Sequence, residues 1–357
     1  MSIDKHHTIF IGNTAVGAEH PPFIIAELSG NHNQQIDLAL AMVDAAAAAG
    51  AHAIKLQTFT ADSMTLDVNS ADFVIQEKNN LWHGASLHGL YAKAATPYEW
   101  HSVLFERAKA QGMLAFSSPF DASAVDFLAE LDVPCYKIAS FELTDIPLIT
   151  KAASMGKPLI MSTGMASLSE IELAVNTAKS AGCQDIILLK CTSTYPAQPS
   201  NTNLFTLPHL REAFNCQVGL SDHTAGVGVS VASVALGANV IEKHFVLDRQ
   251  AGGVDAAFSL EPAEFKMLVD ETERAWQALG EVKYGGSDVE QESKQYRRSI
   301  YVCENIQAGE LFTEQNLRVV RPAFGLAPKY WQAVQGKHAK QDIPKGTALN
   351  WTHVDYS

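Results

Sequence analysis

Two histidines in this sequence each stand at or just after the end of a short apolar run. His223 ends the motif SDH at 221–223, and His244 ends the motif EKH at 242–244. Imidazole nitrogen is a common ligand of divalent metals, and two such ligands leave coordination positions open for water and for a carbonyl or hydroxyl oxygen. A metal held in this way could polarise an aldehyde for attack. The alternative is that each histidine is a hydrogen-bonded core residue.

Lysines and serines stand at the ends of other apolar runs. A lysine is costly to bury without an anionic partner, so Lys55, Lys137 and Lys243 together suggest a bound anion. Ser162 and Ser221 could add hydroxyl donors to a phosphate and a carboxylate, and the turn after Ser162 exposes backbone N–H groups at a helix start. The sequence therefore predicts an anion site.

Glu27 ends the first apolar run and is a candidate for binding sugar hydroxyls or transferring a proton. The structural alternative is a ring of salt bridges between the lysines and Glu27, Glu142 and Glu242, in which Glu142 lies farther beyond its own run. Tyr195, in CTSTYP, could donate a hydrogen bond from a loop. No base is evident beside Cys191, so we interpret this cysteine as structural.

The elements that carry these residues repeat one plan from residue 23 onward: a short apolar run, a polar break, and a segment with helical apolar spacing. The predicted strands are 23–28, 53–58, 114–119, 135–140, 158–163, 186–191, 217–222 and 240–245. Eight alternations favour an α/β fold of the (β/α)8 (TIM) barrel type, in which the C-terminal strand ends form one catalytic mouth. The long interruption at about 60–96 predicts a loop that shapes the substrate pocket.

The length of 357 residues favours two domains. We predict a barrel domain over residues 1–281, a polar linker over 282–296, and a small β-rich domain over 297–357, where the segments are short and punctuated by glycine.

Composition limits the partners and the compartment. The net charge of -13 and the lack of a basic tract argue against nucleic-acid binding. Five scattered cysteines without a Cys-x-x-Cys pair suit free thiols in a reducing compartment, and predict a cytoplasmic protein. The N-terminus has no basic start leading into an apolar stretch and no apolar run reaches membrane-spanning length, so we expect no membrane association.

Eight motifs occur in an order that resembles the N-acetylneuraminate (sialic acid) synthase family: AELSGNHN, KLQT, SSPFD, YKIAS, STGM, CTSTYP, GLSDHT and EKHF. The C-terminal segments RRSIYV and RPAFGL are similar to the antifreeze-like (SAF) domain that follows the barrel in this family. Within the family, LYAKAATPYEWH and LDRQAGGVDAAFSLEP resemble the branch that makes pseudaminic acid. The resemblance covers nearly the whole chain.

The resemblance implies a transferase that condenses phosphoenolpyruvate with 2,4-diacetamido-2,4,6-trideoxy-L-altrose, giving pseudaminic acid and phosphate by C–O cleavage. It implies a divalent metal on His223 and His244, with Mn²⁺ expected and Mg²⁺ or Co²⁺ as alternatives. It also implies a homodimer in which the C-terminal domain completes the partner's active site.

The same resemblance implies a role for each further site residue. Those that would hold phosphoenolpyruvate are Lys55, Lys137, Ser162, Ser193 and Ser221. Those that would contact the sugar are Glu27, Tyr195 and Asp255, with Arg321 reaching the site of a partner subunit. Ser193 stands where neuraminate synthases often have Asn, and Ala323 stands where a Gly is common.

Three alternatives remain at this point. The first is a neuraminate or legionaminate synthase that uses a manno-configured sugar. The second is a Schiff-base aldolase with Lys137 or Lys243 as the covalent amine. The third is a non-catalytic carbohydrate-binding or ice-binding protein.

Overall fold

The computed structural model describes residues 7–76 and 81–356. The chain divides into two compact units, Met1–Leu279 and Gly280–Ser357. Every described helix is too short or too polar to cross a lipid bilayer.

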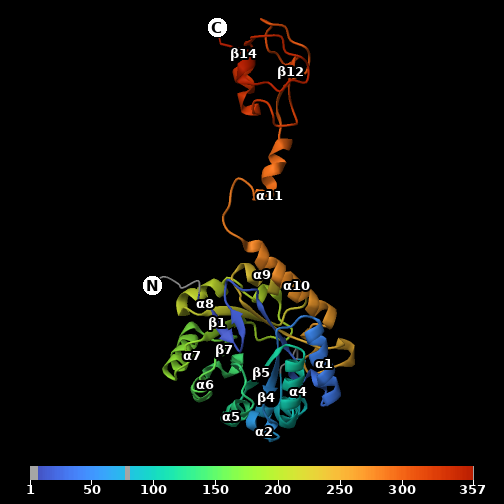
Figure 1. Ribbon diagram of the computed structural model, residues 1–357. Coiled ribbons are helices and arrows are strands. Elements are labelled where there is room, and N and C mark those ends of the chain that lie inside the picture. Colours follow the sequence, from blue (N-terminus) through green and yellow to red (C-terminus); the bar gives the residue numbers. More distant parts are fainter. Residues whose placement is uncertain (1–6, 77–80, 357) are drawn as a thin grey trace. The chain divides into compact units, whose positions relative to one another are not determined.

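Parallel strands of the first unit close into a barrel, in the order β10-β3-β4-β5-β6-β7-β8-β9 within the described residues (Figure 1). The strands are β3 (Phe23–Glu27), β4 (Ala53–Thr58), β5 (Leu114–Pro119), β6 (Tyr136–Ile138), β7 (Leu159–Ser162), β8 (Ile186–Cys191), β9 (Gln217–Asp222) and β10 (Val240–His244). This closure confirms the predicted fold class.

The barrel closes where β10 pairs with β3, with Val240 opposite Phe23 and His244 opposite Glu27. Every residue of these two strands is buried, because one face of each strand packs inside the barrel and the other packs against helices. Such strands appear in the sequence as continuous apolar runs. The polar residues at their C-terminal ends meet at one mouth.

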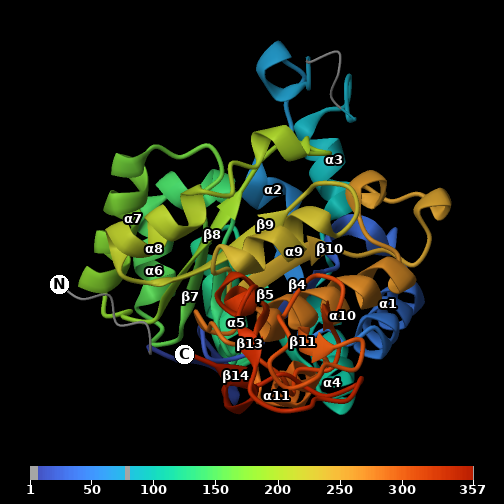
Figure 2. The ribbon, with the colours of Figure 1, turned by 90° about the horizontal axis from the view of Figure 1, so that it is seen from above.

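Helices surround the barrel (Figure 2). The longer ones are α1 (Ile36–Ala48), α4 (Tyr98–Ala110), α5 (Ala122–Glu130), α6 (Ile146–Ala153), α7 (Leu168–Ser180), α8 (Thr206–Phe214), α9 (Gly228–Ala235) and α10 (Pro262–Leu279). Ser167 caps α7 and forms a capping box with Glu170, as its side chain and spacing favour. Pro97 precedes α4, where the fixed φ angle of proline suits a helix start.

A hairpin of β1 (Ile9–Ile11) and β2 (Thr14–Val16) was not anticipated from the sequence. Its buried side chains, such as Ile11, join the core of the barrel. Gln217, the first residue of β9, donates a hydrogen bond to the backbone carbonyl of His7 just before the hairpin. The hairpin therefore lies at the N-terminal ends of the strands, away from the mouth.

The connection between β4 and α4 contains α2 (Ala61–Met64), the short 3-10 helix η2 (Ala71–Phe73) and α3 (Leu87–Ala94). The end of α3 lies against the turn after β3, since a Cβ atom on Gly30 would come within 2.9 Å of the Cα atom of Ala94. Only glycine permits this approach without a shift of backbone. The connection is thereby anchored beside the mouth.

The second unit is small and β-rich, as predicted. β11 (Ser299–Val302) pairs antiparallel with β12 (Leu317–Val320), and β13 (His338–Ala339) pairs with β14 (Val354–Asp355). Two short helices, α11 (Asp288–Gln291) and α12 (Trp331–Val334), complete the regular elements described outside 3-10 turns. Buried side chains including Ile300, Phe312 and Leu349 form a separate core.

Candidate active site

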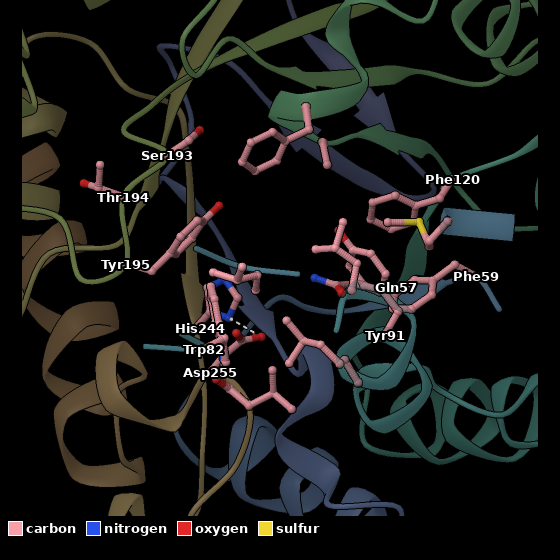
Figure 3. A pocket seen from close by; sticks show the side chains of 18 of the residues that line it. Gln57, Phe59, Trp82, Tyr91, Phe120, Ser193, Thr194, Tyr195, His244 and Asp255 are labelled. Atoms are coloured by element: carbon pink, nitrogen blue, oxygen red, sulfur yellow. Dashed lines mark hydrogen bonds and ion pairs between the residues drawn. The ribbon is translucent and has the colours of Figure 1, made fainter. Parts of the chain in front are cut away.

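A cavity of about 760 Å³ lies at the C-terminal ends of the barrel strands. Ser193, Tyr195, His244 and Asp255, all predicted site residues, line it. Figure 3 shows Ser193, Tyr195 and His244 on one side and the rings of Phe59 and Tyr91 on the other. The connection after β4 supplies many of the lining side chains, which confirms that it shapes the pocket.

Buried charges form a network among the barrel strands. Glu27 forms an ion pair with Lys55, whose Nζ atom also lies 3.7 Å from Glu242 Oε2. Lys137 Nζ lies 3.8 Å from Glu242 Oε1. These four side chains are at most 6 % exposed. The ring of salt bridges considered as an alternative is therefore formed only in part, between Glu27 and Glu242 and two of the lysines proposed to bind an anion.

Serine hydroxyls join the same network. Lys137 Nζ donates to Ser162 Oγ at 2.7 Å, and Ser221 Oγ donates to Glu242 Oε1 at 2.9 Å. The predicted residues Lys55, Lys137, Ser162 and Ser221 are thus brought together with Glu242 between them. The cluster combines ammonium and hydroxyl donors, the groups that bind phosphate and carboxylate oxygens.

Burial and neighbouring charges shift the pKa values of the groups in this cluster in opposite directions. Burial raises the pKa of Glu27 to about 7, against the attraction of Lys55. Burial lowers the pKa of Lys137, although Glu242 opposes this change. For Glu242, Lys137 and Lys55 together outweigh burial and lower its pKa. Glu27 can therefore exchange a proton near neutral pH, as a general acid or base requires.

The two histidines lie together at the ends of neighbouring strands, with ring centroids 5.2 Å apart. His223 Nδ1 lies 3.0 Å from the carbonyl oxygen of Thr192, which makes Nδ1 the donor and leaves Nε2 with a lone pair. His244 Nδ1 is buried, with no hydrogen-bond partner among the described residues, and Asp255 Oδ2 lies 3.8 Å away (Figure 3). Burial and the nearby charges lower the pKa of His244 well below its usual value, so this imidazole is neutral.

This pair fits a divalent metal, because each ring keeps a nitrogen free to bind it. In residues 7–76 and 81–356, no group of three or more His, Cys, Asp or Glu side chains is arranged to hold a metal ion. A metal at His223 and His244 would therefore complete its coordination with oxygens from water or substrate.

Aromatic rings surround the histidines. The ring of Tyr195 lies 4.7 Å from that of His223 and 5.1 Å from that of Phe258, measured between centroids. Burial raises the pKa of Tyr195, so its hydroxyl stays protonated and can donate to a ligand. Trp82 packs against Tyr195 and donates from its indole nitrogen to the carbonyl of Val254 at 3.2 Å.

Asp255 is held by residues that the sequence analysis did not identify. Ser29 donates to its carboxylate, and Asn31 Oδ1 accepts from the backbone N–H of Asp255 at 3.1 Å. The Asn31 amide nitrogen also donates to the Phe245 carbonyl at 3.0 Å and to Ser259 Oγ at 2.9 Å. Both residues belong to the SGN turn after β3, so their position directly after a strand was the available signal.

Ser193 lies in a tight cradle. A Cβ atom on Gly164 would come within 2.7 Å of Ser193 Oγ and within 2.5 Å of Ser140 Cβ. The close approach of these three residues places two serine side chains around the turn that follows β7. Ser140 was not singled out in the sequence, although it is the last residue of the predicted strand 135–140.

The structure changes the interpretation of two other residues, Glu142 and Cys191. Glu142 lines the cavity, its Oε2 atom has no hydrogen-bond partner in the described part of the chain, and burial raises its pKa to about 7. Cys191 does have an imidazole nearby, since its Sγ atom lies 3.9 Å from His223 Nδ1. The influence of His223 outweighs burial and lowers the pKa of this thiol to about 7.

Lys243 does not join the anion cluster, and that expectation is wrong. Its Nζ atom donates to Asp222 Oδ2 at 2.8 Å and to the Thr224 carbonyl at 2.6 Å. Successive strand residues point to opposite faces, so Lys243 faces away from the side on which Glu242 and His244 lie. Asp222 also accepts from Ser230 of α9 at 2.6 Å, so the pair joins the barrel to its helix layer.

His32 is structural. It is completely buried, its Nε2 atom lies 3.2 Å from Thr96 Oγ1, and its ring meets Trp100 of α4 edge to face. Arg321 lies in the second unit, exposed and directly after β12.

Both units of the chain match known protein families. The model of the NeuB family matches residues 42–284, and that of the SAF domain matches residues 297–355. The chain is 46% identical over 327 residues to the pseudaminic acid synthase of Campylobacter jejuni subsp. jejuni serotype O:2, covering 92% of this chain and 95% of that one. It is 38% identical over 323 residues to the N,N'-diacetyllegionaminic acid synthase of the same organism, covering 89% and 96%.

A solved structure is also similar. The N-acetylneuraminic acid synthetase of Leptospira borgpetersenii serovar Hardjo-bovis, in complex with citrate, superimposes with a TM-score of 0.72 at 36% identity. The match covers 80% of this chain and 95% of that one.

Proposed function

The chain belongs to the NeuB family, and we propose that it is a pseudaminic acid synthase. It condenses phosphoenolpyruvate with 2,4-diacetamido-2,4,6-trideoxy-L-altrose to give pseudaminic acid and phosphate. The observation that carries this proposal is the 46% identity to a pseudaminic acid synthase over 92% of the chain. The related legionaminic acid synthase is less similar, at 38%, so the manno-configured alternative is not favoured.

The buried lysine cluster supports a strongly anionic substrate. Lys55 and Lys137 are balanced by Glu27 and Glu242 when no ligand is bound. A phosphate and a carboxylate entering this cluster would add negative charge, which a low-dielectric site does not tolerate without compensation. The pKa of Glu27, raised to about 7, allows this group to take up a proton and leave Lys55 to the substrate.

His223 and His244 would hold one divalent metal, which we propose to be Mn²⁺ with Mg²⁺ or Co²⁺ as alternatives. When bound, it supplies a Lewis acid that polarises the sugar aldehyde.

The chain's own side chains position the reactants. Lys55, Lys137, Ser162, Ser193 and Ser221 hold phosphoenolpyruvate through its phosphate and carboxylate. Its methylene carbon then attacks the aldehyde carbon, water adds at C2, and the C2–O bond to phosphate breaks. Electrostatic positioning by these donors, without a covalent intermediate on the protein, accounts for most of the catalysis.

Glu27, Tyr195 and Asp255 complete the site on the sugar side. Tyr195 offers a protonated hydroxyl and Asp255 a carboxylate, and both line the cavity. Glu27 accepts a hydrogen bond from Gln57 at 3.2 Å and is placed to transfer a proton. We further propose that Arg321 reaches the site of the partner in a homodimer. The five free cysteines support a cytoplasmic location.

The test is a panel of sugars with phosphoenolpyruvate and metal, with products identified by mass spectrometry. We expect the L-altrose derivative to react best and to release one phosphate per sugar acid. Efficient reaction of N-acetylmannosamine without reaction of the altro sugar would contradict the proposal. Borohydride trapping of a lysine adduct would instead support the Schiff-base aldolase.

A further inference from the structure

One side of the cavity carries a group of apolar side chains that have no part in the reaction described above, with Gln57 beside them (Figure 3). We name this surface the apolar wall, and it consists of six residues: Phe59, Ile75, Leu87, Leu90, Tyr91 and Phe120. Phe59 directly follows β4, Phe120 directly follows β5, and the others belong to the connection between β4 and α4. In Figure 3 the wall residues Phe59, Tyr91 and Phe120 lie across the cavity from Ser193 and Tyr195.

The aromatic part of the wall is rigidly packed. The Phe59 ring meets Phe120 at 5.2 Å between centroids and 79° between planes, and it meets Tyr91 at 5.9 Å and 81°. These are favourable edge-to-face arrangements. Phe59 is only 2% exposed, so its position is set by the barrel rather than by a ligand. Packing within the protein therefore fixes the part of the wall formed by Phe59.

The two sides of the cavity differ in polarity. Among the six wall side chains, Tyr91 alone carries a polar atom, its hydroxyl. A sugar hydroxyl directed at the rings of Phe59 and Phe120 would lose its water without gaining an equivalent partner, which is unfavourable. A methyl group directed at the wall would gain free energy from leaving water. The wall therefore favours sugars that direct an apolar end, rather than a hydroxyl, toward it.

We propose that the apolar wall selects the sugar by its C4–C6 end. It receives the C6 methyl and the methyl of the C4 acetamido group, while the aldehyde lies toward His244 on the opposite side. This inference rests on the proposed function, because the trideoxy sugar lacks a C6 hydroxyl. The aldehyde must reach the histidine pair, so the other end of the open chain extends across the cavity to the wall.

The expected selectivity is moderate. An apolar pocket rejects a ligand that merely adds a hydroxyl by about 100-fold. We therefore expect kcat/KM for the trideoxy sugar to exceed that for its C6-hydroxylated counterpart, 2,4-diacetamido-2,4-dideoxy-L-altrose, by about 100-fold.

Isosteric substitutions separate polarity from shape. Phe120→Asn and Phe120→Leu remove the same ring and leave side chains of similar size. Phe120→Asn should reduce the preference for the trideoxy sugar by at least about 10-fold, whereas Phe120→Leu should retain most of it. Leu90→Asn is a second polar variant, in case the first does not fold. Leu66→Asn, at an exposed position of the same connection, is the control and should behave as wild type.

The measurements are kcat/KM for both sugars and KM for phosphoenolpyruvate, on full-length folded protein with metal. The phosphoenolpyruvate KM should stay unchanged in all wall variants. An unchanged sugar preference in Phe120→Asn and Leu90→Asn, or an equal loss in Phe120→Leu and Phe120→Asn, overturns the role of the wall while the synthase function stands. A wild-type enzyme that uses N-acetylmannosamine and neither altro sugar overturns the proposed function itself.

Discussion

His244 and Glu27 lie directly opposite each other in the pairing of β10 with β3, at the seam where the barrel closes. Paired residues of neighbouring strands point to the same face of a sheet. A proposed metal ligand and the proposed proton-transferring carboxyl are therefore held side by side by backbone hydrogen bonds.

Removal of a histidine should abolish metal-dependent turnover without unfolding the protein. Loss of a residue that only supports a metal ligand lowers activity by roughly 10- to 100-fold. We expect His223→Ala, which removes a proposed ligand itself, to lower kcat/KM by more than this. Metal content after dialysis should fall in parallel. His209→Ala, at an exposed position on α8, is the matched control. Unchanged activity and metal content in His223→Ala would remove this residue from the site.

Glu27 should impose a pH dependence on the reaction. Its pKa is raised to about 7, so the carboxyl is protonated below this pH and ionised above it. Because the protonated form leaves Lys55 to the substrate, kcat/KM should fall as the pH increases through about 7. We expect Glu27→Gln to lower the rate by about 100-fold or more and to abolish this limb of the profile. Persistence of the limb in Glu27→Gln would assign it to another group, and Glu142→Gln then becomes the next variant to examine.

Lys243 should matter for stability and not for substrate binding. Lys243→Met leaves Asp222 as an uncompensated buried charge, which costs about 3–5 kcal/mol in the free energy of unfolding. Urea unfolding measures this loss. The pKa of Asp222 is lowered mainly by Lys243 acting against burial, so the stability from this pair is present above pH 4 or so and is lost as the pH falls further.

Lys137→Met is the matching variant in the anion cluster, on the opposite face of the barrel strands from Lys243. It should raise the KM for phosphoenolpyruvate strongly, whereas Lys243→Met should leave that KM unchanged. The reverse pattern would place Lys243 in the anion site.

Asn31 should position the Asp255 loop. Asn31→Ala removes three hydrogen bonds, each contributing about 1 kcal/mol. We expect the KM for the sugar to rise about tenfold or more, with little change for phosphoenolpyruvate. Gln35→Ala, at an exposed position shortly after the same turn, is the control. Equal effects on both substrates would indicate general destabilisation.

Arg321 should act in trans if the dimer is arranged as proposed. Arg321→Ala and His223→Ala should each be inactive alone. Mixed by refolding or co-expression, they should recover about a quarter of wild-type activity, because half of the dimers are mixed and each mixed dimer has one intact site. Sedimentation should show a dimer, and absence of recovery would exclude a shared site.

The strands were predictable because burial on both faces leaves continuous apolar runs, as in β4 and β8, where the predicted and observed bounds coincide. The hairpin β1–β2 was missed because two strands of three residues carry too little pattern. Lys243 was misplaced because a polar residue at a strand end can face either side, and only the register decides which. Asn31 and Ser29 act through a loop more than 200 positions away, a contact that no local pattern encodes.

The burial of Lys55 and Lys137 has a kinetic consequence. Both substrates approach from the mouth, yet Lys55 and Lys137 are almost completely buried, whereas Tyr195 and Asp255 line the cavity above them. A sugar bound first would stand between solvent and the lysines. We therefore expect phosphoenolpyruvate to bind before the sugar.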